Sequence, residues 1–511
     1  MFLYIFVAIF LGASLYFYNK NPKYAVYFIV FLAPWHGLDV DIGLRVTAYL
    51  IALTPLVIII YTQSIIGRSR HKGIVNLFYF FVSYMVIRSI LQMLLLPDST
   101  VVGGFFRTPA MRSFIQILMF FIIISPIFII QRLIKNYSDL LIIGKIYVQS
   151  TILLAILGWV QIALWFSTGV NPLPIGFMNQ LLGGVDQGTI REGIFMSGDS
   201  FIYRMNSLGG EPKDLGAGLV IGMLLIQIFL SSDLLQQAKR YQAKVVWVFL
   251  AVSAFATFST MAYYMWIIGT VVIFSSKFLI GYRGFRLINS NKYKNKNFPI
   301  YLSGLFLSLS LIIYLMISDS FIYSLIYDRT VGREGRNIIE DFDEAIIAFF
   351  FDNPLQAIIG VGLGNIHLYA GKYLASDVFQ YAGGGVFFAK SGYLKIISDL
   401  GLFGLILFFI WIILQYRLLK KSLSSEVNNQ FNVLKATILL FGWIMFVEYL
   451  ATIYISDQFF ITLGIVCAAI SLSRLKKTDA NFRSRLDLHN RSLPSPTHGR
   501  GAVVEGSGFN A

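Results

Sequence analysis

Apolar runs of about 18 residues or more recur along this chain of 511 residues and constrain its fold more than any other feature. A hydrocarbon core about 30 Å thick needs ~20 residues of helix at 1.5 Å per residue. Because backbone groups find no water at that depth, a helix must satisfy them within itself. Only 13% of the residues are charged, against about 25% in an ordinary soluble domain. We therefore expect an all-α polytopic membrane protein.

The apolar runs predict thirteen membrane helices, within a range of about 12–14. The run 245–281 is too long for one helix, and we interpret it as a hairpin that turns at Ser259 and Thr260. The other predicted spans are about 2–18, 24–37, 46–64, 74–96, 113–131, 140–167, 213–231, 299–317, 391–416, 434–453 and 458–473. Residues 1–477 would then form one membrane-embedded domain. Segment 478–511 is polar and without apolar periodicity, so we expect a disordered tail, with vector sequence as one possible source of part of it.

Basic residues predict the orientation, because Lys and Arg concentrate in cytoplasmic loops. The basic clusters all fall on one face of the thirteen-span arrangement: 68–72, 132–135, 239–244, 283–296, 417–421 and 474–477. With that face in the cytoplasm, the N-terminus and two long loops, about 168–212 and 318–390, lie outside, and the C-terminus lies inside. This bias, together with anionic lipid, accounts for the net charge of +15, so we expect membrane lipid as a partner and no nucleic acid.

Cysteine usage limits the chemistry further. Cys467 is the single cysteine, which excludes a disulfide within the chain and a zinc–thiolate site. Its apolar surroundings in the sequence favour the role of a small core residue. We expect neither a metal ion nor another cofactor.

Charged residues gather in the two long external loops, where basic side chains are normally scarce. The basic ones are Arg191, Arg204, Lys213, Arg329, Arg333, Arg336, Lys372 and Lys390. For any one of them, solvation or a salt bridge with a loop carboxylate is an alternative explanation. As a set they favour anion binding, because the guanidinium fork fits phosphate oxygens in bidentate fashion. Such a site at the bilayer surface suits a lipid-linked diphosphate better than a free sugar or a metal ion.

Three motifs follow one another in these loops. The first is Arg204-x-x-Ser207-x-x-x-Glu211-Pro212, at the opening of a predicted span. The second is the segment 353–365, which contains Asn-Pro-Leu and then Gly-Val-Gly-Leu-Gly-Asn, and the third is 390–405, which contains Lys-Ser-Gly-Tyr-Leu and Gly-Leu-Phe-Gly-Leu. In this order they resemble the O-antigen polymerase/ligase superfamily (Wzy-type polymerases and O-antigen ligases) over about residues 190–420.

Two departures from that superfamily bear on function. Eleven residues separate Arg204 from Gly216, where some polymerases have ten between arginine and glycine. Lys390 stands where the ligases carry a histidine, so the ligase's candidate base is missing and polymerase is favoured.

The resemblance implies glycosyl transfer in a GT-C-like fold of the bacterial inner membrane. The donor would be an undecaprenyl-diphosphate-linked oligosaccharide and the acceptor another lipid-linked repeat of O-antigen, capsule or exopolysaccharide, with a chain-length regulator as a possible protein partner. Arg204 would stabilise the leaving diphosphate, and Glu211 is the candidate base. An ion pair with Arg204 or a helix N-terminal charge is the alternative for Glu211. Substrate contacts would come from Arg191, Lys213, Arg329, Arg333, Arg336, Lys390 and Tyr393. A ligase, or a transporter or flippase of lipid-linked glycans, is the alternative function.

Four further features have simpler explanations. The glycines of 360–364 lie in no βαβ unit, so they predict a turn that lets the backbone approach the membrane surface and not a nucleotide loop. Gly218 and Gly222 predict close helix packing. Lys395 and Asp399 are one helical turn apart and predict an i,i+4 ion pair. Arg88, inside a predicted span, would either face a cavity or form a structural contact, with snorkelling or a pair with Glu448 as the options.

Overall fold

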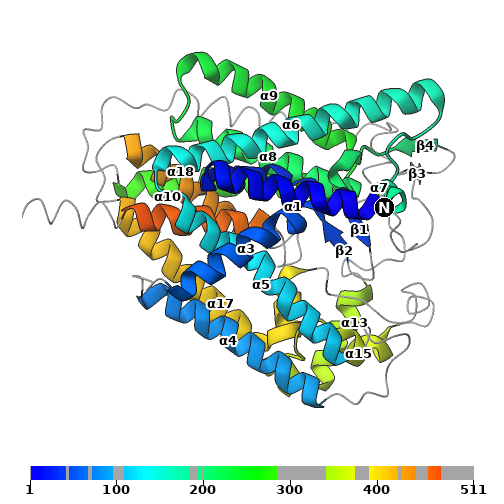
Figure 1. Cartoon of the computed structure of the whole chain (residues 1–511), viewed down its shortest axis with the longest axis vertical. Coiled ribbons are helices and arrows are strands. Elements are labelled where there is room, and N and C mark those ends of the chain that lie inside the picture. Colours follow the sequence, from blue (N-terminus) through cyan, green and yellow to red (C-terminus); the bar gives the residue numbers. More distant parts are fainter. Residues whose placement is uncertain are drawn as a thin grey trace, which may run out of the picture.

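The computed structural model describes residues 2–41, 45–66, 72–95, 109–182, 194–197, 200–284, 341–374, 389, 391–423, 429–444 and 458–473. Most of these residues are helical, and the long helices run side by side in a bundle (Figure 1). Five of the described helices are long and apolar enough to cross a membrane: Phe2–Lys20, Ser113–Leu133, Tyr137–Thr168, Pro212–Ser231 and Gly392–Ser422. Shorter apolar helices accompany them. The chain is a multi-pass helical membrane protein.

The helices lie close to the predicted spans. The helices that correspond to predicted spans are α1 (Phe2–Lys20), α2 (Pro22–Leu32), α3 (Ala48–Ile66), α4 (Lys72–Leu95), α5 (Pro109–Leu133), α6 (Tyr137–Thr168), α8 (Pro212–Ser231), α9 (Gln237–Ala256), α10 (Thr260–Gly284), α17 (Gly392–Leu423), α18 (Asn429–Trp443) and the apolar helix Gln458–Ser473. The predicted span at 299–317 and the tail 478–511 lie outside the described residues.

Short elements connect the long helices. They are α7 (Phe177–Leu181), η3 (Ser207–Gly209), α13 (Asp341–Asp352), α14 (Pro354–Ile359), α15 (Ile366–Ala370) and η5 (Gly371–Tyr373). Two antiparallel hairpins join them, β1 (Asp39–Asp41) with β2 (Arg45–Thr47) and β3 (Ile194–Ser197) with β4 (Ser200–Tyr203). The expectation of helices alone therefore missed two small hairpins in the connecting loops, and α2 ends at Leu32 where a span to about 37 was predicted.

Helix α8 is the most deeply buried candidate span, and it packs against α6, α9 and α10. Its glycines make this possible. A Cβ on Gly222 would lie 2.6 Å from Thr151 Oγ1 of α6, and one on Gly216 would lie 2.8 Å from Ala262 Cβ of α10. There is also little room for a side chain at Gly218, since a Cβ there would lie 3.3 Å from Pro34 Cβ. The predicted use of Gly218 and Gly222 for close packing is confirmed.

The hairpin of α9 and α10 was also predicted correctly, because α9 ends at Ala256 and α10 begins at Thr260. Phe258 in the turn has a positive φ of 46°. Helix α9 begins at Gln237 and not near 245, so the basic residues Lys239, Arg240 and Lys244 belong to its first turns. The half-buried Cys467 packs against the main apolar core, in agreement with the prediction.

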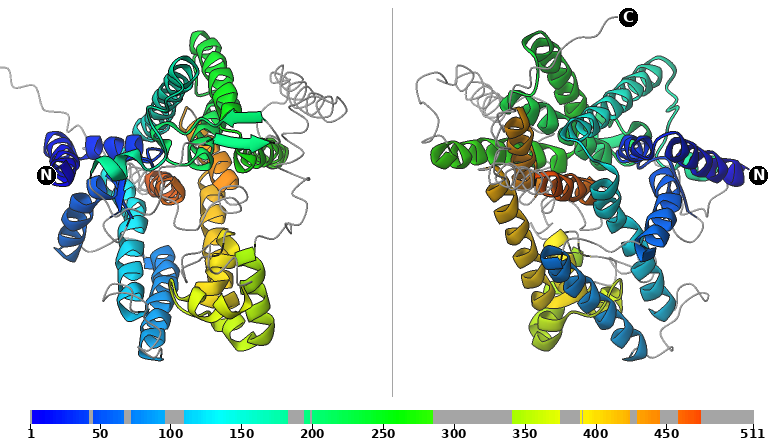
Figure 2. Two further views of the ribbon diagram at one scale, coloured as in Figure 1. Left: turned by 90° about the vertical axis from the view of Figure 1, so that its right-hand side faces the viewer. Right: turned by 60° about the vertical axis from the view of Figure 1, so that its left-hand side comes forward.

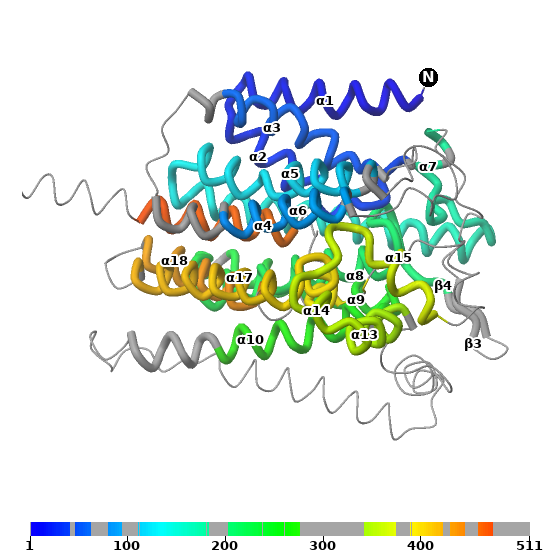
Figure 3. Tube along the Cα trace, turned by 90° about the horizontal axis from the view of Figure 1, so that it is seen from below, coloured from blue at the N-terminus to red at the C-terminus, as the bar shows by residue number. Residues whose placement is uncertain are grey.

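One end of the bundle gathers the segments that come from both long loops (Figure 3). The N-terminus, β3, β4, α7, α13 and α15 all lie there, and we call it the hairpin end. Figure 2 shows α4 and α17 beside the short helices of this end. The predicted placement of the segments 194–212 and 341–374 on a common side is thus reproduced.

Candidate functional site

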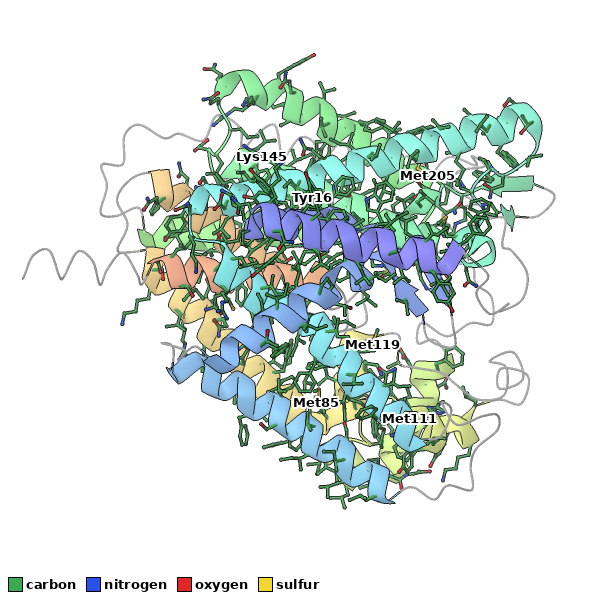
Figure 4. The ribbon with its side chains drawn as sticks, viewed as in Figure 1. Tyr16, Met85, Met111, Met119, Lys145 and Met205 are labelled. Atoms are coloured by element: carbon green, nitrogen blue, oxygen red, sulfur yellow. The ribbon has the colours of Figure 1, made fainter. Side chains whose placement is uncertain are left out.

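The first half of the site is the segment from Tyr203 to Glu211, which lies along the turn between α9 and α10. The backbone N–H of Met205 donates to Ala256 O at 3.0 Å. One residue earlier, Arg204 Nε donates to Thr257 O at 3.2 Å. The side chain of Met205 is fully buried against α6, where a Cβ on Gly158 would lie 2.5 Å from its sulfur (Figure 4). These contacts fix the position from which the Arg204 guanidinium extends.

A buried amide, Gln161 of α6, organises the backbone behind Arg204. Its Oε1 accepts from the backbone N–H of Ser207 at 2.8 Å, and its Nε2 donates to Asn206 Oδ1 at 2.8 Å. The same Nε2 donates to Leu173 O at 2.8 Å and to Asn171 Oδ1 at 3.0 Å. Gln161 therefore joins α6, the loop after it and the segment before α8.

Glycines allow residues 208–210 to approach the loop after α2. The backbone N–H of Gly37 donates to Leu208 O at 3.0 Å, and a Cβ on Gly37 would lie 2.8 Å from Gly210 N. Gly210 has a φ of +98°, a conformation that L side chains rarely adopt. A hollow beside this contact is lined by Leu173, Gly176, Phe177, Ser207 and Gly210, among other residues.

Glu211 stands at the N-terminal end of α8 with extended backbone angles, φ −72° and ψ 154°. Its carbonyl accepts from the backbone N–H of Asp214 and Leu215, which starts the helix. Its carboxylate Oε2 lies 3.0 Å from Lys213 Nζ, and the two side chains are 37% and 49% exposed. The alternative predicted for Glu211, an ion pair, thus has Lys213 as its partner here. Pro212 at the first helical position needs no hydrogen-bond acceptor there.

Arg204 and Glu211 nonetheless influence each other electrostatically. Burial lowers the pKa of Arg204 below its usual value, while the negative charge of Glu211 and the phenol of Tyr263 act in the opposite direction. Arginine is not deprotonated in proteins, so the guanidinium keeps its charge at neutral pH. The structure therefore places a partly buried cation and a half-exposed carboxylate near the N-terminal end of α8.

The second half of the site is the glycine loop, residues 360–364, which packs against a break in α17. Gly401, with φ 71° and ψ 179°, interrupts this helix. The backbone N–H groups of Val361 and Gly362 donate to Ser398 O at 2.8 Å and Asp399 O at 2.9 Å. A Cβ on Gly401 would overlap Ile358 O. The backbone of this loop thus lies against the C-terminal end of the half-helix that begins at Gly392, and the predicted approach to the membrane surface stays a prediction.

Arg88 of α4 holds the other side of this loop. Its Nη2 donates to Gly360 O at 2.6 Å and to Gln356 Oε1 at 3.2 Å, and its Nε donates to Ile359 O at 3.2 Å. Arg88 therefore makes a structural contact with backbone and amide oxygens, whereas the pair predicted with Glu448 is not tested. Glu448 lies outside the described residues.

Lys395 and Asp399 form the predicted i,i+4 ion pair, with Nζ 3.0 Å from Oδ2. Their side chains are only 3% and 0% exposed, so this is a buried pair and not a surface one. Asp399 Oδ1 also accepts from Gly364 N at 3.3 Å. The pair thereby ties the half-helix to the glycine loop.

The remaining predicted site residues divide into two groups. The ring of Tyr393 stacks on Phe409, with centroids 5.8 Å apart, and packs against the main core. The Lys372 ammonium lies 4.9 Å from the ring centroid of Tyr373. The residues that lie outside the described part are Arg191, Arg329, Arg333, Arg336 and Lys390.

Sequence reasoning overlooked two features of this end. Gln161 carried no signal, because its partners are separated from it by up to 46 residues. Asp-x-Asp pairs occur at Asp39 and Asp41 in β1 and at Asp341 and Asp343 in α13. Among the described residues, neither pair belongs to a group of three or more His, Cys, Asp or Glu that could hold a metal ion.

No protein-family model matches this chain, and no curated protein matches its sequence.

Proposed function

We propose that this protein is an inner-membrane glycosyltransferase with a GT-C-like fold that polymerises undecaprenyl-diphosphate-linked oligosaccharides on the external face. The observation that carries the proposal is the position of Arg204, held by Thr257 O, in the segment that leads to Glu211 at the N-terminal end of α8. A cation that is fixed through its Nε suits a diphosphate, and a half-exposed carboxylate is accessible to an acceptor hydroxyl.

In the proposed reaction, the bond between the anomeric carbon of the donor and its diphosphate oxygen breaks. The acceptor hydroxyl oxygen forms the new glycosidic bond, and its proton passes to Glu211. The negative charge that remains on the lipid diphosphate lies against Arg204, in a partly buried place where a charge contact is stronger than in water. Lys213, bonded to Glu211, would orient the carboxylate. Arg191, Arg329, Arg333, Arg336 and Lys390 remain proposed contacts to the donor.

A transporter of lipid-linked glycans is the second candidate, and one observation favours it. Buried charges and an interrupted helix mark many transport pathways, and α17 combines both in Lys395, Asp399 and Gly401. Against this, Asp399 and Arg88 bond to the glycine loop. A ligase that transfers the glycan to lipid A core would use the same donor contacts and differ in its acceptor.

The deciding experiment supplies a synthetic lipid-linked repeat unit to the purified protein in nanodiscs and separates the products by length. A ladder of products supports the polymerase, a single transfer onto added lipid A core supports the ligase, and translocation without a new bond supports the transporter. Arg204→Ala should abolish the ladder, and Arg204→Lys should restore little, because a point charge does not reproduce the guanidinium fork. Arg240→Ala is the matched control, since Arg240 pairs with Asp233 beyond the other end of α8.

A further inference from the structure

A chain of aromatic rings runs between α9 and α10, directly beneath Arg204. Tyr263 lies 5.0 Å from Phe255, Phe255 lies 6.0 Å from Trp266, and Trp266 lies 5.8 Å from Trp247, measured between ring centroids. We call these four residues the aromatic seam. Its rings come alternately from the two helices, which diverge from their common turn (Figure 2).

The upper end of the seam coincides with the cationic site. Arg204 bonds to Thr257 in the turn that joins the two helices, and Tyr263 is close enough to act on its charge. Tyr263 Oη donates to Phe255 O at 2.9 Å, which fixes the first two rings. The lower end is deeper, because Trp247 precedes Phe255 by eight residues, or ~12 Å along a helix.

Apolar side chains continue the surface on both sides of the seam. Val248 and Val252 of α9 are 53% and 51% exposed, and Ile267 and Val271 of α10 are 41% and 45% exposed. In a membrane protein such faces contact hydrocarbon. A hydrocarbon chain that lies on the aromatic seam therefore has apolar surroundings from its first carbon onwards.

We propose that the aromatic seam binds the first isoprene units of a polyprenyl tail whose diphosphate lies on Arg204. This inference rests on the proposed function, because it assigns a place to the tail of that donor. A prenyl chain is esterified directly to the diphosphate, so its first unit must lie next to the cation. An ordinary phospholipid places a glycerol unit there and its acyl chains further away. Methyl-branched, unsaturated units also pack well on aromatic faces, which supply large apolar areas.

Binding of undecaprenyl diphosphate without sugar tests the seam independently of catalysis. Trp266→Ala should weaken its binding to the protein in nanodiscs roughly tenfold, the effect of losing a large aromatic contact. Tyr264→Ala, which alters a neighbouring exposed residue of the same helix, should change it less than twofold. Inorganic diphosphate should bind Trp266→Ala as it binds the native protein, and should bind Arg204→Ala more weakly.

A photoreactive geranyl diphosphate keeps the test valid if Trp266→Ala does not fold. On the unaltered protein it should cross-link to peptides of α9 or α10, and undecaprenyl diphosphate should compete whereas phosphatidylglycerol should not. Equal competition by phosphatidylglycerol would assign the seam to bulk lipid and overturn the inference, as would cross-links confined to other helices. If Trp266→Ala still makes a polymer ladder and binds the donor with unchanged affinity, the proposed role of the aromatic seam is wrong but the proposed polymerase function stands. If the native protein binds the tail at the aromatic seam but makes no polymer, the proposed polymerase function is wrong but the tail-binding role of the seam stands.

Discussion

Gln161 and Asn206 are 45 residues apart in the chain and are joined by a hydrogen bond of 2.8 Å between side chains that are 0% and 1% exposed. Because Gln161 Oε1 also accepts from Ser207 N, one side chain satisfies donors and acceptors of the segment that carries Arg204. The proposed diphosphate site thus depends on a side chain that extends from a different helix.

Gln161→Leu should destabilise the protein, because a residue of similar size leaves several buried polar groups unpaired. Each such group costs roughly 1–3 kcal/mol, and the segment from Arg204 to Gly210 should lose its fixed position. We expect a lower unfolding temperature and weaker donor binding. Gln242→Leu provides the control, since Gln242 is an exposed residue of α9. Equal unfolding temperatures for the two variants would contradict the role assigned to Gln161.

The sequence predicts the helices well because a long apolar run in a bilayer is stable only as a helix. The hairpin at 257–259 was foreseen for the same reason, since the run 245–281 exceeds what one span needs. The break in α17 was not foreseen. In an apolar run, a glycine can serve either close helix packing or a backbone with positive φ. For Gly401, only the contact with Ile358 in the structure tells these two roles apart.

The candidate site was predicted in part. Arg204 and Glu211 were selected from one short segment, and the structure brings them close enough to interact. An ion-pair partner of Glu211 is Lys213, two residues away at the start of α8. The partners of Arg88 were unpredictable, since they lie 268 to 272 residues further along the chain.

Gly401→Ala should be severely destabilising, since a Cβ would overlap Ile358 O and the backbone has a φ of 71°. Strain and overpacking together should cost more than about 3 kcal/mol. Gly12→Ala in α1 is the matched control, because nothing lies within 4 Å of the added Cβ. It should be neutral or stabilise the helix by up to ~1 kcal/mol. Thermal unfolding in the same detergent compares the two, and similar losses would argue against a strained break.

Asp399→Asn should destabilise the protein by roughly 3–5 kcal/mol, because it leaves the Lys395 charge buried opposite a neutral group. The double variant Lys395→Met with Asp399→Leu should be more stable than Asp399→Asn, although the bond from Gly364 N is lost. Arg240 and Asp233, which are 31% and 54% exposed, form the control pair, and Asp233→Asn should cost at most ~1 kcal/mol. A double-mutant cycle that shows no coupling between Lys395 and Asp399 would contradict this account.

Cysteine labelling tests the orientation. In a Cys467→Ala background, Leu355→Cys at the hairpin end should react with an impermeant maleimide added to spheroplasts. Lys420→Cys, in the last turn of α17, should react only after the membrane is made permeable. This expectation follows from the basic clusters, which favour the cytoplasm. The reverse labelling pattern would place Arg204 and Glu211 in the wrong compartment for an external polymerase.

Glu211→Gln separates a catalytic base from a purely structural carboxylate. The amide keeps the size of the side chain and can still bond to neighbouring groups, but it cannot take the acceptor's proton. If Glu211 is the base, single-turnover transfer should slow by roughly 10²–10⁴ while donor affinity changes little. Lys213→Met is the matched control, because it removes the ion-pair partner of Glu211 and leaves the carboxylate in place. That variant should slow transfer less than Glu211→Gln does, because the base remains although it loses the partner that orients it. A normal single-turnover rate in Glu211→Gln would exclude the base role, and a loss of donor affinity in both variants would assign the Lys213–Glu211 pair to binding.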